Sequence, residues 1–250
     1  MALQRWPVEG PRILLIHGVT GIAESWWRIG PALAQHGYDV TAVDQAGHGG
    51  RALIGEATPD ALADAVLECY PEGPDVLIGH SLGTITALAL LERDRGWART
   101  VILEEPPTAL APERCRLIAE TIAADAVAVR EDRSGYTERL RSVVPWAEED
   151  LHWAVQGLAE MEVEPFVRRF EALALEPPAR APDRILAAAP EAYVLVGRPA
   201  AEGGSVLSAA DRDELAARLP AGHVIELDGG HCLHRDVPDA WLAAVVSIVG

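Results

Sequence analysis

Short apolar runs alternate with longer amphipathic stretches along the chain. The short runs are rich in Val, Ile or Leu and most end near Gly, Asp or Pro, as buried strands do. We expect strands at 12–17, 39–43, 75–79, 100–104, 193–197 and 223–227. We expect helices at 25–36, 58–69, 82–94, 208–218 and 237–248. This alternation predicts an α/β fold with a mainly parallel sheet that helices cover on both faces.

One long segment departs from this alternation. From Pro106 to Pro190 the chain has helical patterns separated by proline-containing breaks, with no convincing strand. Connections in α/β units usually take about 2–6 residues, so this segment is too long to be an ordinary loop. We expect a core formed by 1–105 and 191–250, with a helical cap at 106–190 over one end of the sheet.

Two apolar stripes occur within this insertion. Trp146 and Trp153 lie seven residues apart, almost on one face of a helix, and Leu151, Val155 and Leu158 form a separate stripe. A helix needs only one such stripe to pack, so the second could line a substrate pocket. The alternative is a tryptophan pair that is buried in the core or covered by a partner.

Composition and charge narrow the class of protein. The chain has 250 residues, of which 49% are apolar, and this length suits one compact core. With 21 basic and 38 acidic residues, the formal charge is -17, and such a field repels nucleic acid and anionic membranes. Lysine is absent, which excludes Schiff-base chemistry on a lysine. A small molecule is therefore the expected partner, and the sequence leaves the oligomeric state open.

Neither a metal site nor a membrane segment is expected. The three cysteines, Cys69, Cys115 and Cys232, are too few and too scattered for a disulfide framework or a Cys-rich site. The histidines show no metal-binding H-x-x-x-H or H-E-x-x-H spacing. No secretion signal is visible in residues 1–10, and no run of about 18 apolar residues occurs. We expect a cytoplasmic protein without a cofactor.

The segment from Gly79 to Gly83 carries the strongest chemical signal. It has the sequence GHSLG, follows the apolar run DVLI and precedes the helical run TITALALLE. This is G-x-S-x-G in the strand–turn–helix context that the motif requires. The glycines suit a cramped turn that holds Ser81 clear of the sheet, above a helix N-terminus whose amides favour a developing oxyanion.

Three further motifs follow other predicted strands. The first strand ends in HGVTG, which places the Val19 amide as an oxyanion donor beside the amide of Leu82. A glycine-rich DQAGHG occupies 44–49, and GGHCLH follows the last strand and places His231 on a loop. Serine first and histidine last, with an acid between them, is the order of the triad in α/β-hydrolases.

With these four motifs in order, the chain resembles the α/β-hydrolase fold superfamily over most of its length. The resemblance implies that Ser81 is the nucleophile, that His231 is the general base, and that Val19 and Leu82 supply the oxyanion hole. His234 is expected to be a neighbour of the site rather than the base. The insertion occupies the position of the family's cap, and the family's leading hairpin is expected to be reduced.

The acid of the triad departs from the family pattern. Family members usually carry it after the seventh strand, where this chain reads GRPAAEGG and offers Glu202, two residues late. Some members, certain haloalkane dehalogenases among them, carry it instead after the sixth strand, where Glu104 and Glu105 stand here. Adjacent strand residues face opposite ways, so only one of this pair can point toward the site. We predict Glu105, with Glu202 and Glu104 as alternatives.

The resemblance implies acyl transfer without a cofactor. We expect a serine hydrolase of a carboxylic ester, lactone or thioester with an apolar part, with a pocket lined by Trp27, Trp146 and Trp153. The alternative keeps fold and site but uses them for C–C bond hydrolysis, cyclisation or another lyase-type step, because one fold hosts many chemistries.

Overall fold

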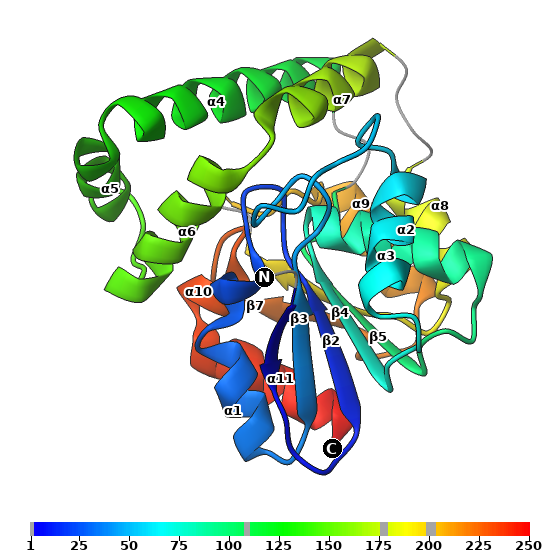
Figure 1. Ribbon diagram of the computed structural model, residues 1–250. Coiled ribbons are helices and arrows are strands. Elements are labelled where there is room, and N and C mark those ends of the chain that lie inside the picture. Colours follow the sequence, from blue (N-terminus) through cyan, green and yellow to red (C-terminus); the bar gives the residue numbers. More distant parts are fainter. Residues whose placement is uncertain (1–2, 108–110, 176–179, 199–203) are drawn as a thin grey trace.

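The computed structural model describes residues 3–107, 111–175, 180–198 and 204–250, in which seven strands form one sheet (Figure 1). Their order is β1-β3-β2-β4-β5-β6-β7, and all neighbouring pairs are parallel except β1 with β3. The strands are β1 (Leu3–Trp6), β2 (Arg12–Ile16), β3 (Asp39–Val43), β4 (Val76–His80), β5 (Thr100–Glu104), β6 (Tyr193–Gly197) and β7 (Val224–Leu227). The predicted strands and the predicted fold class are confirmed.

The sequence did not predict strand β1. Its four residues, LQRW, include two polar ones, and it lies at the edge of the sheet, antiparallel to β3. Such a short edge strand carries too little apolar periodicity to be recognised. Its Trp6 covers Gly30, where an added Cβ would lie 2.3 Å from the indole.

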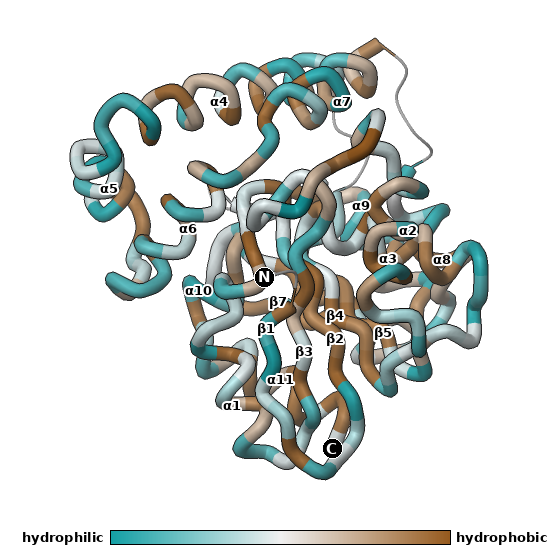
Figure 2. Tube along the Cα trace, viewed as in Figure 1, coloured by the Kyte–Doolittle hydropathy of each residue, from teal (hydrophilic) through white to brown (hydrophobic). Residues whose placement is uncertain are grey.

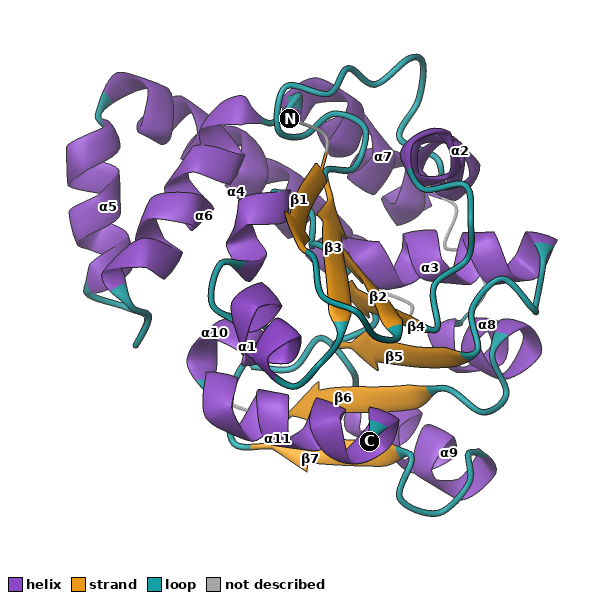
Figure 3. Cartoon of the chain, turned by 60° about the horizontal axis from the view of Figure 1, so that its bottom comes forward, coloured by secondary structure: helices purple, strands orange, loops and turns teal. Residues whose placement is uncertain are grey.

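Helices cover both faces of the sheet (Figure 3). Alternate residues of β2 enter different cores, with Ile13 and Leu15 in one and Leu14 and Ile16 in the other. In Figure 2, β2 and β4 are coloured as hydrophobic over most of their length, as expected for strands buried on both sides. One face is covered by α1 (Ile29–Gln35), α10 (Leu233–Asp236) and α11 (Pro238–Val249), and the other by α2 (Pro59–Cys69), α3 (Leu82–Arg93), α8 (Ala181–Ala188) and α9 (Ala209–Arg218).

The helix predicted at 25–36 is two elements. A 3₁₀ turn, η1, occupies Ala23–Trp26, and α1 begins at Ile29. The reason is Pro31, which in a helix starting at 25 would remove an interior hydrogen bond and clash with the preceding turn. Restarting the helix at Ile29 places this proline in the first turn, where its missing N–H is tolerated.

Most of the helical insertion lies over the carboxyl ends of the strands (Figure 1). It comprises α4 (Pro112–Glu131), α5 (Arg133–Arg141), α6 (Glu148–Glu160) and α7 (Val163–Leu175), and α4 and α7 pack side by side. Two contacts tie it to the loops after β2 and β3. The Glu162 N–H donates to the Gly47 carbonyl at 2.8 Å, and Gly157 lies so close to Thr20 that an added Cβ would be 2.5 Å from its carbonyl oxygen.

The last helix of the 106–190 segment packs elsewhere. Helix α8 lies against α3 and α9, and its Ile185 is fully buried in the core on that face of the sheet. The layer above the strand ends is therefore formed by α4 to α7 alone among the described helices. Within the described residues, no helix is both long and apolar enough to cross a membrane.

Candidate active site

Ser81 lies in a strained turn between β4 and α3. Its φ of 50° and ψ of -113° place it outside the regions that residues with a Cβ prefer. The two motif glycines have no room for a side chain. A Cβ on Gly79 would lie 2.5 Å from the Gly83 carbonyl oxygen, and one on Gly83 would lie 2.2 Å from the Ile16 carbonyl oxygen. The turn therefore requires glycine at both positions, which is the steric reason inferred from the sequence.

His231 lies directly beside this serine. Its Nε2 is 3.0 Å from Ser81 Oγ, so the hydroxyl can donate to the imidazole. The backbone of His231 is held in turn by His80, whose Nε2–H donates to the His231 carbonyl at 2.9 Å. The last residue of β4, His80, thus holds the backbone of His231, and the next residue along the chain is Ser81.

Glu105 completes a chain of three side chains with Ser81 and His231. It follows β5 directly, is fully buried, and places Oε2 3.4 Å from His231 Nδ1. Two backbone N–H groups donate to the same carboxylate at 2.7 Å each, from Gly197 to Oε1 and from Val206 to Oε2. These bonds fix the carboxylate where it can orient the imidazole and stabilise its protonated form.

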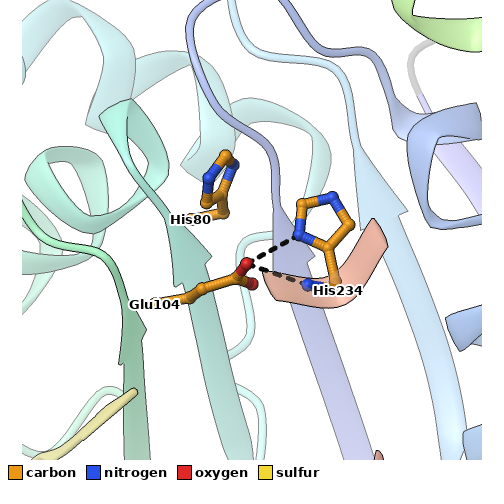
Figure 4. Close-up of side chains that lie close together, drawn as sticks. All are labelled: His80, Glu104 and His234. Atoms are coloured by element: carbon orange, nitrogen blue, oxygen red, sulfur yellow. Dashed lines mark hydrogen bonds and ion pairs between the residues drawn. The ribbon is translucent and has the colours of Figure 1, made fainter. Parts of the chain in front are cut away.

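The structure does not bring Glu104 to His231. Its Oε1 accepts from the backbone N–H of His234 at 3.1 Å and from His234 Nδ1–H at 2.8 Å (Figure 4), and its Oε2 accepts from Trp241 Nε1–H at 3.0 Å. Glu104 therefore ties β5 to α10 and α11 on the opposite side of the strand. The third candidate, Glu202, lies outside the described residues.

His80, Glu104 and His234 form a buried cluster whose potential ligand atoms lie within 4.8 Å of one another (Figure 4). The spacing alone would allow a metal ion. The Glu104 carboxylate, however, already accepts three N–H groups, so a cation would have to displace them. Burial raises the pKa of Glu104 and lowers the pKa values of His80 and His234 well below their usual range. The cluster is best described as a hydrogen-bonded support for the loop that carries His231.

Two backbone N–H groups without a partner among the described residues belong to residues that line the same cavity as Ser81. Within the described part of the chain, neither the Val19 nor the Leu82 N–H has a hydrogen-bond acceptor, and both residues line the cavity that contains Ser81. Most backbone N–H groups of a folded protein are paired, so these two half-buried residues have N–H groups that a bound ligand could use. The oxyanion role of Val19 and Leu82 stays a prediction.

The loop that carries Val19 is fixed by groups from the first two motifs. His48 Nε2–H donates to the Val19 carbonyl at 2.6 Å, and His17 Nδ1–H donates to the Gly18 carbonyl at 2.8 Å. Gln45 closes the network by donating from Nε2 to the His17 carbonyl at 2.7 Å. Burial lowers the pKa of both histidines.

Asp44, in the second motif, holds the segment after β2 that also carries Val19. Its Oδ1 accepts from the Ala23 N–H at 2.7 Å. The carboxylate also packs against Gly49, where an added Cβ would lie only 2.4 Å from it. Burial raises the pKa of Asp44 to about 6. The loop after β2 is therefore supported by a carboxylate whose charge is disfavoured by its surroundings.

Ser81 opens into a cavity of about 800 Å³, counted with its open mouth. Besides Ser81 and Cys115, its polar lining is two arginines, and the rest is apolar. The lining comprises Val19, Ala57, Pro59, Leu62, Ser81, Leu82, Ile85, Pro107, Cys115, Phe166, Arg169, Phe170, Leu173 and Arg184. Besides Ala57 and Pro107, these residues come from the loop that carries Val19, from the turn at Ser81, from α2 and α3, and from α4, α7 and α8 of the insertion.

The structure places the three tryptophans predicted for the pocket outside this lining. Trp27 donates from Nε1 to Asp150 of α6 at 2.8 Å, and Trp146 donates from Nε1 to Asp236 of α10 at 2.6 Å. Both bonds join the insertion to the core. The first runs from an indole of the core to a carboxylate of the insertion, and the second runs from an indole of the insertion to a carboxylate of the core. Trp153 Nε1 is buried and has no partner in the described residues. Two of the indoles therefore attach the insertion to the core and leave the cavity to Phe166 and Phe170.

Comparison with known proteins identifies the family to which this fold belongs. The model of the alpha/beta hydrolase family matches residues 13–245. The chain belongs to the alpha/beta hydrolase family. It is similar to the lipase LipV of Mycobacterium tuberculosis, with 32% identity over an alignment of 126 residues that covers 49% of this chain and 48% of LipV. The match thus spans about half the length of that relative.

Solved structures of this family share the fold over nearly the whole chain. A hydrolase from Pseudomonas aeruginosa PA01 has a TM-score of 0.76 and 20% identity, covering 99% of this chain and 93% of its own. An enol-lactonase from Burkholderia xenovorans LB400 has a TM-score of 0.73 and 22% identity, covering 99% and 95%. At these identities the likeness concerns the fold alone.

The alpha/beta hydrolase motifs contain several supporting residues whose partners the sequence could not identify. His17, Gln45, His48 and His80 all stand inside HG, DQAGHG or GHSLG, so their positions were visible. Their partners are carbonyl oxygens of residues 18, 17, 19 and 231, and no pattern in the sequence indicates such a pairing. Glu104 gave a signal only as the neighbour of Glu105.

Proposed function

We propose that this alpha/beta hydrolase is a serine hydrolase of carboxylic esters, lactones or thioesters with an apolar part. The observation that carries the proposal is the chain Ser81–His231–Glu105 at the end of an apolar cavity. Its distances are 3.0 Å from Ser81 Oγ to His231 Nε2 and 3.4 Å from His231 Nδ1 to Glu105. The similarity to a lipase supports the same reaction class.

In the proposed mechanism Ser81 attacks the substrate carbonyl. His231 Nε2 takes the hydroxyl proton as the serine oxygen forms its bond to the carbonyl carbon, and the amides of Val19 and Leu82 stabilise the oxyanion. His231 then returns the proton to the leaving alcohol or thiol, which leaves an acyl-serine. Water hydrolyses that ester by the same route, with Glu105 stabilising the imidazolium in both halves.

We further propose that α4 to α7 act as the cap of the active site. Phe166, Phe170 and Leu173 of α7 line the same cavity as Ser81, and in this proposal their apolar surface excludes water from the acyl-serine. Substrates with an apolar group near the carbonyl gain most from this surface, since burying apolar area is worth about 25 cal/mol per Å².

The proposal is tested with a panel of esters, lactones and thioesters of increasing chain length. We expect hydrolysis that is abolished in Ser81→Ala, together with labelling of Ser81 by a fluorophosphonate. A protein that the fluorophosphonate labels at Ser81 but that leaves the whole panel intact would favour C–C bond hydrolysis or a lyase-type step. A protein without either reaction would contradict a nucleophilic serine.

A further inference from the structure

The charge of the active-site cavity is opposite to the charge of the protein. The chain has 38 acidic and 21 basic residues, yet the charged groups in the lining described for this cavity are two arginines, Arg169 and Arg184. No carboxylate occurs in that lining. A cavity that is otherwise apolar thus presents only positive charge to its contents.

The two arginines differ in what already neutralises them. Arg184 makes a forked ion pair with Glu92, with distances of 3.0 and 3.1 Å from Nη2 and 3.1 Å from Nε. Arg169 makes no hydrogen bond or ion pair with any described residue. Its neighbour on α7, Arg168, is paired with Glu164 at 3.0 Å and faces solvent. Arg169 is therefore the guanidinium whose charge is left for a ligand.

The position of Arg169 makes this charge effective. It is half-buried on α7, in the same helix as Phe166 and Phe170, and all three line the cavity. A guanidinium beside apolar walls has lost part of its hydration without gaining a partner. A carboxylate would replace the lost hydrogen bonds to water, because its two oxygens match the fork of N–H donors of the guanidinium.

We propose, on the basis of the function above, that the substrate carries a carboxylate at the far end of its apolar part and that Arg169 binds it. The substrate class is then an ester, lactone or thioester of an ω-carboxylated chain, such as a monoester of a dicarboxylic acid. The apolar lining accommodates the methylene chain, Ser81 attacks the esterified end, and Arg169 selects the charged end. The carboxylate can belong to the acyl or to the alcohol part, and the test separates the two.

The experiment compares monomethyl esters of dicarboxylic acids of four to eight carbons with the matched dimethyl esters. Acetate esters of ω-hydroxy acids form a second arm, in which the charge is on the alcohol part. We expect a preference for the charged ester in one of these two arms, and that arm identifies the part of the substrate that carries the carboxylate. In that arm, kcat/KM for the ester with a free carboxylate should exceed kcat/KM for the matched neutral ester. In Arg169→Met this value should fall about 10- to 100-fold for the charged ester, with less than about threefold change for the neutral ester. Arg169→Lys should restore part of the loss.

Arg168→Met is the matched control, because it removes the adjacent arginine, which is exposed and paired. It should leave both esters unchanged. An equal effect of Arg169→Met on charged and neutral esters, or a preference of the parent protein for the neutral esters in both arms, would overturn the proposal.

A binding measurement separates this inference from the proposed function. Ser81→Ala cannot turn over an ester, so calorimetry with monomethyl suberate should show binding that is lost in the Ser81→Ala/Arg169→Met double variant. Binding that depends on Arg169 in a protein inert on every ester would leave the inference standing and refute only the hydrolase function. If the parent protein hydrolyses esters but the binding of monomethyl suberate does not depend on Arg169, the hydrolase function stands and the inference about Arg169 is refuted.

Discussion

Ser81 and Glu105 directly follow the neighbouring parallel strands β4 and β5, and both have a φ of 50°. They are the non-glycine residues with positive φ in the described part of the chain. The residues just before them, His80 and Glu104, are paired in register across β4 and β5, and the Ser81 N–H donates to the Glu104 carbonyl at 2.9 Å. Both strands thus turn sharply at the same level, and His231 lies between the two side chains.

The strain at Ser81 gives a prediction that separates its role in the fold from its proposed role in catalysis. Ser81→Ala and Ser81→Gly should both lower turnover by about 10⁶, because each removes the hydroxyl. Ser81→Gly should be the more stable variant, by about 1 kcal/mol, since glycine adopts this backbone conformation without strain. Denaturant melts and ester assays of both variants test this. Residual hydrolysis above a tenth of the parent rate would contradict the proposed nucleophile.

Glu105→Gln and Glu104→Gln form a matched pair of fully buried neighbours. Glu105→Gln should lower kcat by up to about 10⁴, because the amide cannot stabilise the protonated His231. Glu104→Gln should mainly lower stability, since one of three N–H donors then faces an amide N–H₂ group. The measurements are kcat at fixed pH and the free energy of unfolding. If Glu105→Gln keeps most of the parent rate while Glu202→Gln loses a hundredfold, the acid is Glu202.

Asp44 predicts a pH dependence of stability with a definite sign. Its pKa in the folded protein, about 6, lies above the ordinary value of 3.8, so the folded state binds more protons between these two pH values. The contribution of Asp44 to the free energy of unfolding is therefore greatest below about pH 4 and is lost as the pH rises through about 6. Asp44→Asn keeps an oxygen for the Ala23 N–H and removes the titration. The stability of the parent relative to this variant should fall across that interval in urea melts; a constant difference would exclude the raised pKa.

The indole–carboxylate bonds between insertion and core predict an effect on stability without an effect on selectivity. Trp146→Phe removes the bond to Asp236 and should lower the free energy of unfolding by about 1–2 kcal/mol beyond the loss from reduced packing. Trp153→Phe is the control, because it removes the same atoms from the side chain. The N–H that it removes has no hydrogen-bond partner in the described residues. Neither should change the preference of the enzyme among ester chain lengths. If Trp146→Phe raised KM for long-chain esters only and left the free energy of unfolding unchanged, Trp146 would instead be a residue of the substrate pocket.

The sequence alone was sufficient for features that depend on local periodicity and on backbone sterics. The apolar runs predicted the six strands that follow β1, because buried parallel strands must be apolar on both faces. Glycines at 79 and 83 predicted the turn at Ser81, because no other residue avoids contact with the carbonyls of Gly83 and Ile16. The proposed roles of Ser81 and His231 follow from such local motifs and stay predictions until the variants are measured.

The sequence favoured Glu105 over Glu104, but only the tertiary structure shows that Glu105 lies next to His231 and that Arg169, unlike Arg168, lines the cavity beside Ser81. Alternation along a strand shows that neighbours face opposite ways, but the side that faces His231 depends on where β5 ends relative to β4 and β7. The tryptophans were assigned to the pocket because an apolar stripe does not indicate what it packs against. Likewise, an arginine becomes a recognition group only when packing leaves it unpaired in a cavity, and such a pairing is made between segments far apart in the chain.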